Sequence, residues 1–253
     1  MSVAAVDARA LGAARNNAAW CDAVCCAHGR SPRFEPRAWC HDGPGLRFYP
    51  NLVTLDPTLT TADVAPWLAR LSSLPGIGEF GVKDSFARLD LTPLGMHLLF
   101  EAQWIHRLPQ PHAGPPGALH WRVVVSEALR AGWEAAWRRG AGEPAGDAPM
   151  FPPSLLQSPG VTLLAGCRGD EVVAGCALTV SDDVVGMSCN FHGPLDPQAA
   201  LHETLAEIHR RHPGRAIVGY EAGDDLALAQ ACGFNCTGPL RVWLRAAAPG
   251  TPC

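Results

Sequence analysis

Three ionisable residues in the last quarter of the sequence carry the chemistry needed for proton transfer. Glu221 follows an extended run that ends at Tyr220, and His192 lies at the end of an earlier extended run. A carboxylate or an imidazole can act as a general base, often through a water molecule, and a tyrosine hydroxyl can protonate a leaving group. We therefore expect Glu221 or His192 to be the base of an active site and Tyr220 to be its proton donor.

The same residues also have structural interpretations, which the sequence leaves open. Glu221, Asp224 and Asp225 could cap the short helix that we expect to begin at Asp224, because carboxylates stabilise the first turn of a helix. His192 could be a solvated loop residue, and Tyr220 could be a core residue whose hydroxyl lies at the rim.

Polar and apolar side chains share the extended run from Val184 to Phe191 and the residue after it. Successive side chains of a strand point to opposite faces of the sheet. One face should therefore carry Ser188, Asn190 and His192, and the other face Met187, Cys189 and Phe191.

The first half of the chain offers a second group of charged residues. Lys83 is the only lysine in the sequence, and Asp84 and Ser85 follow it directly. Glu101 lies in an otherwise apolar run, where burial without a partner would be costly, so it should face solvent, a cleft or Lys83. We expect Lys83, Asp84 and Glu101 to bind a substrate, and a structural ion pair is the alternative.

Hydrophobic periodicity predicts the elements that position these residues. In the first half we expect helices over 9–29 and 61–72, short extended pieces over 37–40 and 49–55, and a strand, a short helix and a closing strand between 81 and 106. The second half should begin with a strand over 120–125 and a helix over 126–139. An antiparallel meander of three strands follows, over 161–167, 171–180 and 184–191. The last elements are a helix over 197–211, a strand over 216–220, a short helix over 224–231 and a strand around 240–244.

A stretch rich in proline and glycine, residues 107–118, is predicted to be a linker between an N-terminal half, 1–106, and a C-terminal domain, 119–253. The ends of the two halves can be aligned, with residues 82–87 on 222–227 and Trp104 on Trp243. In both copies an acidic residue is followed by a short helix, a glycine and a strand that ends in tryptophan. This order of signals predicts an internal duplication.

The composition excludes several classes of protein. Hydrophobic residues make up 47% and charged residues 17% of the chain, which is typical of a globular fold. A net charge of −4 argues against nucleic acid as a partner. No apolar window is long enough to span a membrane and no secretory signal is present, so we expect a cytoplasmic protein. The sequence does not set the oligomeric state.

Ten cysteines in a chain without an export signal are expected to be reduced. The densest group, Cys21, Cys25 and Cys26 followed by Cys40, lacks the paired spacing of a zinc site. We therefore expect no metal, and we interpret these thiols as small buried residues of a helix that faces the core. A cysteine-dependent or metal enzyme built on this group is a further interpretation.

The order of elements from 120 to 245 is similar to that of the GNAT superfamily of N-acetyltransferases. The passage from Gly166 to Gly175 resembles the hairpin on which that family builds its acceptor side, and the passage from Ala229 to Phe234 resembles its short fourth helix and the residues leading into its last strands. The resemblance implies an α/β (α+β) fold of two GNAT-like halves, each a mixed and mostly antiparallel sheet flanked by helices.

The resemblance also implies a thioester ligand, acetyl-CoA or another acyl-CoA. In this family the strand before the main helix splays away from its neighbour. A loop of the form Q/R-x-x-G-x-G/A, together with the start of the helix, then offers backbone N–H groups to the diphosphate. Carried over to this sequence, the cofactor-binding residues are Cys189, Asn190, Phe191 and Gln198.

The loop of this chain departs from that motif. Leu201 and Glu203 stand where the family has small residues, and Asp196 near the start of the helix would repel a phosphate. Two functions follow. The first is an acyl-CoA-dependent N-acyltransferase acting on a small-molecule or peptide amine, and the second is a catalytically inactive GNAT-like scaffold that binds a small molecule or a protein partner.

Overall fold

The computed structural model describes residues 6–110, 117–144, 146, 148–181 and 183–246. The chain forms two compact units, Met1–Trp104 with Thr237–Cys253, and Ile105–Cys236. Strands β5, His97–Arg107, and β11, Asn235–Arg245, each run from one unit into the other. The units therefore differ from the predicted halves, because β11 pairs with a strand of the first unit. Residues 111–116 of the predicted linker lie outside the described residues.

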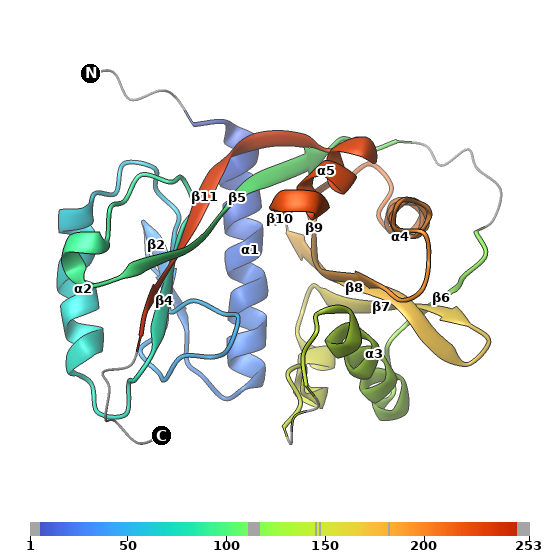
Figure 1. Cartoon of the computed structure of the whole chain (residues 1–253), viewed down its shortest axis with the longest axis horizontal. Coiled ribbons are helices and arrows are strands. Elements are labelled where there is room, and N and C mark those ends of the chain that lie inside the picture. The colour runs from blue at the N-terminus through green and yellow to red at the C-terminus, as the bar shows by residue number, and fades with distance from the viewer. Residues whose placement is uncertain (1–5, 111–116, 145, 147, 182, 247–253) are drawn as a thin grey trace. The chain divides into compact units, whose positions relative to one another are not determined.

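The first unit is a mixed sheet with a helix on each face. Its strand order is β1-β2-β3-β4-β11-β5, in which β3 and β4 run parallel and β4 and β11 run antiparallel. Figure 1 shows α1 and α2 on opposite sides of β2 and β4. The bounds are α1 Ala8–Ala27, β1 Arg33–Phe34, β2 Ala38–Cys40, β3 Leu52–Thr54, α2 Thr61–Ser73, β4 Phe80–Asp84 and the 3-10 turn Thr92–Leu94.

Alternating side chains of this sheet reach the two helices. Ala38, Cys40 and Val82 join the core beneath α2, whereas the indole N–H of Trp39 donates to Asp22 of α1 at 2.8 Å. The amino group of Lys83 likewise donates to Asn17 of α1 at 2.7 Å. The predicted helices over 9–29 and 61–72 are confirmed, with ends displaced by one or two residues.

The short helix that we predicted to begin at Asp84 does not form. Asp84 ends β4, and its carboxylate accepts the backbone N–H groups of Phe86 and Leu89 at 3.3 and 2.7 Å. Ala87 has a φ of 51°, a left-handed conformation that no right-handed helix accommodates. In place of the predicted helix this stretch contains the 3-10 turn Thr92–Leu94. The structure does not show a duplication.

The second unit contains the meander and helices that the sequence predicts. Its strand order is β10-β9-β8-β7-β6, antiparallel except for the parallel pair β9 and β10. The mixed α/β class and the order β α βββ α β α β are therefore confirmed. The bounds are β6 His120–Val123, α3 Glu127–Gly140, the 3-10 turn Pro153–Gln157, β7 Val161–Arg168, β8 Glu171–Ser181, β9 Val184–His192, α4 Pro197–Arg211, β10 Ala216–Glu221 and α5 Gly223–Ala231.

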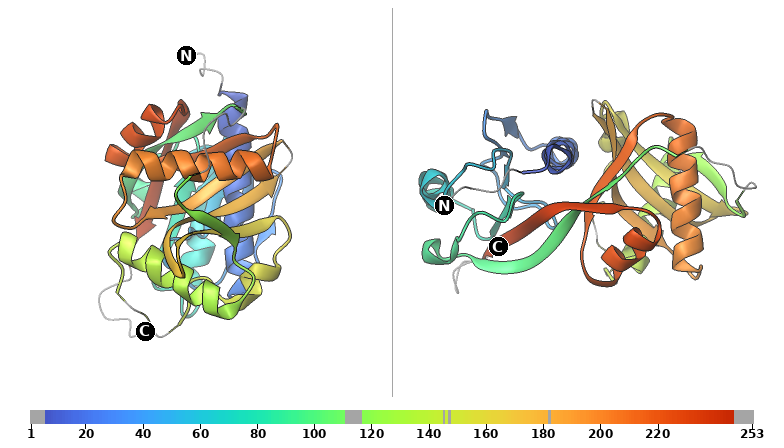
Figure 2. Two further views of the ribbon diagram at one scale, coloured as in Figure 1. Left: turned by 90° about the vertical axis from the view of Figure 1, so that its right-hand side faces the viewer. Right: turned by 90° about the horizontal axis from the view of Figure 1, so that it is seen from above.

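Helices α3 and α4 cover opposite faces of this sheet (Figure 2). On the α4 side, Leu201, Leu205 and Ile208 pack against buried residues of β7, β8, β9 and β10. On the α3 side, the Trp133 ring meets Phe191 edge to face at 5.2 Å, and its indole N–H donates to the carbonyl of Leu164 at 2.8 Å. The sheet is thus held from both faces along β9, the strand that ends at His192.

A buried carboxylate fastens the loop after α3 to the helix. Glu134 is 6% exposed and accepts hydrogen bonds from Arg130 and Arg138, both at 2.8 Å. It also accepts the backbone N–H groups of Met150 and Phe151 at 2.7 and 3.4 Å. Although burial raises the pKa of Glu134, these donors hold it below its ordinary value. The carboxylate therefore fixes the position of α3, whose last turn reaches the site described below.

Replacing Glu134 by Ala should destabilise the protein by about 3 kcal/mol, because two arginines and two buried N–H groups lose their common acceptor. Urea unfolding followed by circular dichroism measures the change. Glu127→Ala is the matched control, since Glu127 lies on the same helix and also binds Arg130 but is 61% exposed at its side chain. It should cost about 0.5 kcal/mol. Equal losses in the two variants would contradict the role of the buried carboxylate.

Candidate active site

Strands β9 and β10 separate before they reach their carboxyl ends. They pair only over three positions, Ala216–Val218 of β10 with Val184–Gly186 of β9. Beyond these pairs β10 continues to Glu221 and β9 to His192 without pairing to each other. Gly219 stands at the point of divergence, where a Cβ atom would lie 3.0 Å from the carbonyl oxygen of Met187. The sheet is therefore open between the ends of two adjacent strands.

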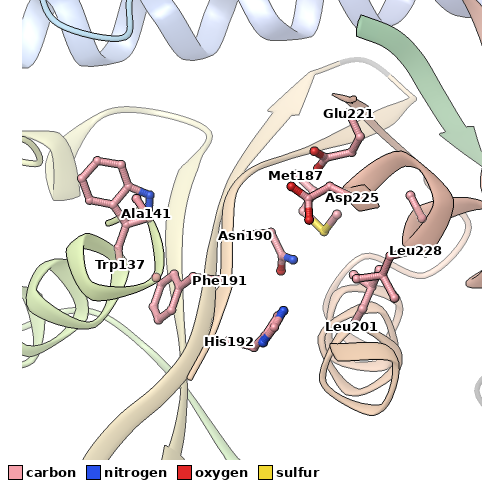
Figure 3. A pocket seen from close by; sticks show the side chains of 12 residues that line it. Trp137, Ala141, Met187, Asn190, Phe191, His192, Leu201, Glu221, Asp225 and Leu228 are labelled. Carbon is pink, nitrogen blue, oxygen red and sulfur yellow. The ribbon is translucent and has the colours of Figure 1, made fainter. Parts of the chain in front are cut away.

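A one-residue bulge in β9 accompanies the opening. Gly175 of β8 pairs with Phe191 and Ala177 pairs with Ser188, so β9 contains one residue more than β8 between these two pairs. Cys189 lies in the bulge with a left-handed φ of 52°. An extra residue inverts the alternation of side chains beyond it. The predicted faces are therefore corrected, because Met187 now lies on the same side as Asn190 and His192, as Figure 3 shows.

A cavity of about 260 Å³ lies at this opening. Glu221 of β10 and Asp225 of α5 form one side of it, and Asn190 and His192 of β9 face them (Figure 3). Apolar walls come from Leu201, Leu228 and Met187. The other end is closed by Trp137 and Gly140 of α3 and by Ala141, the residue after the helix. The cavity thus joins carboxylates, an amide and an imidazole within one unit of the structure.

The pKa of Glu221 is strongly shifted. It is raised from 4.5 to about 7, mainly by burial and in addition by the nearby charge of Asp225. A carboxyl group with this pKa exchanges its proton at neutral pH, which is the property of an effective general base or acid. The sequence prediction of Glu221 as the base agrees with this environment, whereas Asp225, predicted only as a helix cap, acts on it electrostatically.

The amide of Asn190 points into the cavity with an unsatisfied oxygen. Its Oδ1 atom is buried and receives no hydrogen bond from the described residues. Leaving a buried acceptor unpaired costs about 1–3 kcal/mol, so such an atom in a cavity marks a position for a donor on a ligand. The prediction that Asn190 binds a ligand is consistent with this geometry.

The other predicted residues are distributed around the opening. His192 lines the cavity, and Phe191 forms a wall by packing on Trp133. Tyr220 precedes Glu221 on β10 and so points to the opposite face, and it is not part of the lining. Cys189 lies in the bulge behind the lining residues. The structure therefore brings Glu221, His192, Asn190 and Phe191 together and leaves Tyr220 outside.

The residues predicted to bind substrate in the first half belong to the other unit. Lys83 and Asp84 are 3% and 1% exposed, and their hydrogen bonds to Asn17 and to backbone N–H groups use them within the fold. Glu101 is exposed and pairs with Arg241 at 2.7 Å instead of Lys83. Lys83 and Asp84 therefore form hydrogen bonds within the fold, and the ion pair of Glu101 has a different partner from the one expected. The role of these three residues in substrate binding stays a prediction.

The start of α4, where the GNAT resemblance places the diphosphate, is poor in free donors. Two of the seven residues from Gly193 to Ala199 are prolines, which have no N–H group. Three more N–H groups are used internally: Gly193 and Leu195 donate to backbone carbonyls and Ala199 donates to the side chain of Asp196 at 2.8 Å. Gln198, predicted to bind the cofactor, is exposed on the first turn and keeps its N–H. The residues present do not fit a diphosphate here.

The two departures from the loop motif serve the fold. Leu201 is 4% exposed and belongs to the apolar core between α4 and the sheet. Glu203 accepts the backbone N–H groups of Ala118 and Leu119 at 3.0 and 3.1 Å, which ties the segment before β6 to α4. Both side chains thus stabilise α4 where glycine would leave space for an anion.

A second cavity, of about 330 Å³, lies beside the first on the α3 side of β9. Gly140, Phe191 and His192 line both cavities. The second one is also lined by Arg139 and Glu171, which carry opposite charges. A ligand in the opening and another molecule in the second cavity would therefore meet at His192.

Among the described residues, no cluster of three His, Cys, Asp or Glu side chains could hold a metal ion. The described cysteines are all free thiols, and burial raises the pKa of Cys21, Cys25 and Cys40. Thiols of this kind are poor nucleophiles at neutral pH. In the part of the chain that the structure describes, no helix has the length and apolar character needed to cross a membrane.

The architecture matches solved acyltransferases. A GCN5-related N-acetyltransferase from Kribbella flavida has a TM-score of 0.62 at 16% identity, over 94% of this chain and 96% of that chain. A putative acetyltransferase from the GNAT family of Novosphingobium aromaticivorans has a TM-score of 0.52 at 11% identity, over 86% and 91%. N-myristoyltransferase of Saccharomyces cerevisiae, solved with bound myristoyl-CoA and inhibitors, has a TM-score of 0.52 at 9% identity, over 78% and 59%. The chain has the GNAT fold.

No protein-family model and no curated protein matches the sequence. The similarity to GNAT structures therefore establishes the architecture, while the chemistry must be argued from the site that the GNAT fold carries here. The predicted fold is confirmed.

The raised pKa of Glu221 predicts a pH dependence of stability. Between about pH 4.5 and 7 the folded state keeps a proton that the unfolded chain has released, so the free energy of unfolding falls as the pH rises through this window. Glu221→Gln removes this loss and should be more stable than the parent protein by about 2 kcal/mol at pH 8, with no gain at pH 4.

Urea unfolding at the two pH values measures this difference. Glu171→Gln is the control, because Glu171 is an exposed residue of the same unit and its replacement should leave the pH dependence unchanged. A parent protein and a Glu221→Gln variant with parallel pH profiles would show that Glu221 titrates normally.

Proposed function

We propose that this protein is an acyl-CoA-dependent N-acyltransferase that transfers an acyl group to the amine of a small molecule or peptide. The ionisable carboxyl of Glu221 beside the opened strands carries this proposal. An amide-forming reaction needs a base that removes a proton from the amine, and Glu221 has a pKa matched to that task. The GNAT fold supports the assignment, since one similar structure contains bound myristoyl-CoA.

The opening between β9 and β10 fits an acyl thioester. The backbone edges of the two strands no longer bond to each other there, so they can bond to the amide groups of a pantetheine chain laid between them. The unsatisfied Oδ1 of Asn190 supplies an acceptor for one of its N–H groups. This arrangement would bring the thioester carbonyl to the end of the cavity that Glu221 and His192 line.

In the proposed reaction the amine nitrogen forms a bond to the thioester carbonyl carbon, and the carbon–sulfur bond breaks. Glu221 accepts the proton that the nitrogen loses, directly or through water. The sulfur leaves as a thiolate, and His192 at the mouth of the cavity is placed to protonate it. Tyr220, predicted for that step, lies on the other face of β10 and takes no part.

The charge of the cavity favours an amine as the acceptor. Glu221 and Asp225 place two carboxyl groups on one side of it, and the described residues that line it include no lysine or arginine. A protonated amine would be attracted to this pair and would lose its extra proton to solvent before the attack, so that Glu221 remains able to accept the proton that nitrogen releases as the amide forms. The second cavity, with Arg139 and Glu171, offers a polar entrance for the rest of the acceptor.

The alternative function is a catalytically inactive GNAT-like scaffold that binds a small molecule or protein partner. The donor-poor start of α4 favours it, because the usual diphosphate contacts are missing. The two functions differ in one measurable respect. A transferase releases free thiol from acetyl-CoA when an amine is supplied, whereas a scaffold binds its ligand without turnover.

Thiol release from acetyl-CoA in the presence of a panel of primary amines and peptides tests the transferase. Glu221→Gln should lower kcat about 100- to 1000-fold, because general-base catalysis is lost while the shape of the cavity is kept. Binding of acetyl-CoA should be unchanged, as followed by calorimetry. Turnover that survives in Glu221→Gln would remove Glu221 from the mechanism, and binding without turnover by the parent protein across the panel would favour the scaffold.

Asp225→Asn should shift the acidic limb of the pH–rate profile to lower pH, because the charge that helps to raise the pKa of Glu221 is removed. The expected shift is about half a pH unit. Asp224→Asn is the matched control, since Asp224 is exposed in the same turn of α5 and does not line the cavity. A profile that moves equally in both variants would point to the helix terminus rather than to Asp225.

A further inference from the structure

We propose that this protein recognises its thioester by the pantetheine arm alone and makes no diphosphate contact at α4. This inference rests on the proposed function and deepens it. The substrate class would be acyl-pantetheine thioesters, of which acyl-CoA is one. The observation behind it is the disagreement between the opened strands, which fit the arm, and the start of α4, which does not fit the diphosphate.

The start of α4 has few N–H donors that are free to bind an anion. A helix N-terminus binds anions because its first N–H groups have no partners within the helix. Here Pro197 occupies the first position and brings no N–H, and the carboxylate of Asp196 already accepts the N–H of Ala199 at 2.8 Å. An incoming diphosphate would have to displace this cap and would find the Asp196 charge beside it.

Cations could replace the missing N–H donors, but the start of α4 supplies none. The residues from Gly193 to Ala199 include no lysine or arginine. The arginines of α4, Arg210 and Arg211, lie in its last turn and pair with Glu207 at 2.8 and 2.6 Å. Arg139 is a candidate from another element, because it lines the second cavity together with Gly193 and Pro194. It is therefore included in the test.

The cavity at the opening has the groups that a pantetheine arm needs. Pantetheine is uncharged and carries two amide groups, so it needs hydrogen-bond partners and apolar walls rather than cations. Asn190 offers a buried acceptor with no partner among the described residues. Leu201, Leu228 and Met187 supply apolar surface in the same cavity. Leu201 thus adds a wall for the arm at the place where the motif residue for the diphosphate is missing.

Calorimetric titration of the parent protein with pantetheine, 4′-phosphopantetheine, CoA and 3′,5′-ADP tests the proposal. The first three should bind with dissociation constants within about threefold of one another, and 3′,5′-ADP should neither bind nor compete. CoA that binds more than about 30-fold tighter than pantetheine, with competition by 3′,5′-ADP, would overturn the inference while leaving the proposed function intact. If none of the four binds, the proposed function itself fails, and the inference fails with it.

Two variants separate the arm from the diphosphate. Asn190→Ala should weaken pantetheine and CoA alike, by about five- to tenfold, because both lose the same hydrogen bond. The double variant Asp196→Gly with Pro197→Ala frees donors at α4 and should tighten CoA by about tenfold without changing pantetheine. Unfolding curves confirm that each variant folds.

The same titrations identify any diphosphate contact elsewhere. Arg139→Ala should leave the ratio of the CoA and pantetheine dissociation constants unchanged. A variant that weakens CoA alone would place the diphosphate at the α3 side of β9 and would overturn the proposal. An unchanged affinity for CoA in the double variant of α4, with the fold intact, would also count against it.

Discussion

The structure depends on one interruption of hydrogen bonding, the end of the pairing between β9 and β10 after three positions. A parallel pair buried between helices is normally continued, because each unpaired backbone group inside a protein is costly. Here the bulge at Cys189 bends β9 away from β10, and Gly219 permits the close approach at the fork. The backbone groups beyond the fork are left available for a ligand, and the cavity, its lining residues and the acidity of Glu221 all follow from that geometry.

The fork also explains why Glu221 can be partly buried and still ionisable. A carboxyl at the end of a fully paired strand would be either solvated at the sheet edge or excluded from the core. At the open fork it loses most of its water yet still faces a cavity, and the charge of Asp225 on α5 adds to the loss of solvation. The surrounding side chains then decide what can reach it: Asn190 and His192 of β9 are polar, whereas Leu201 of α4 and Leu228 of α5 form apolar walls.

Most of the fold could be predicted from the sequence, because helices such as 126–139 and 197–211 combine a cap with a clear apolar stripe. Glu221 and Asn190 could be selected from their residue types and places after or within strands. The bulge could not be predicted, since the residue with the left-handed φ is Cys189 and not a glycine or an asparagine, and the face predicted for Met187 was therefore wrong. The helix predicted from Asp84 failed for a similar reason, because alanine favours a helix and nothing in its residue type indicates the left-handed φ of Ala87. The cavity residues that come from α3 were missed because their proximity is a property of the fold alone.

The first turn of α4 shows how one set of donors is assigned to a single purpose. The N–H groups of a helix start can bind an anionic ligand or can be satisfied by the protein's own cap, but one group cannot serve both in full. Asp196 and Pro197 stabilise the start of the helix, so this turn is not available to a ligand. Glu203 also binds the segment before β6, and Leu201 packs in the core. Recognition of a ligand is then left to the strands, whose unpaired edges bind amides better than phosphates. A GNAT fold with this distribution of donors is suited to an uncharged arm, and the charge that remains in its cavity, on Glu221 and Asp225, is available for the amine.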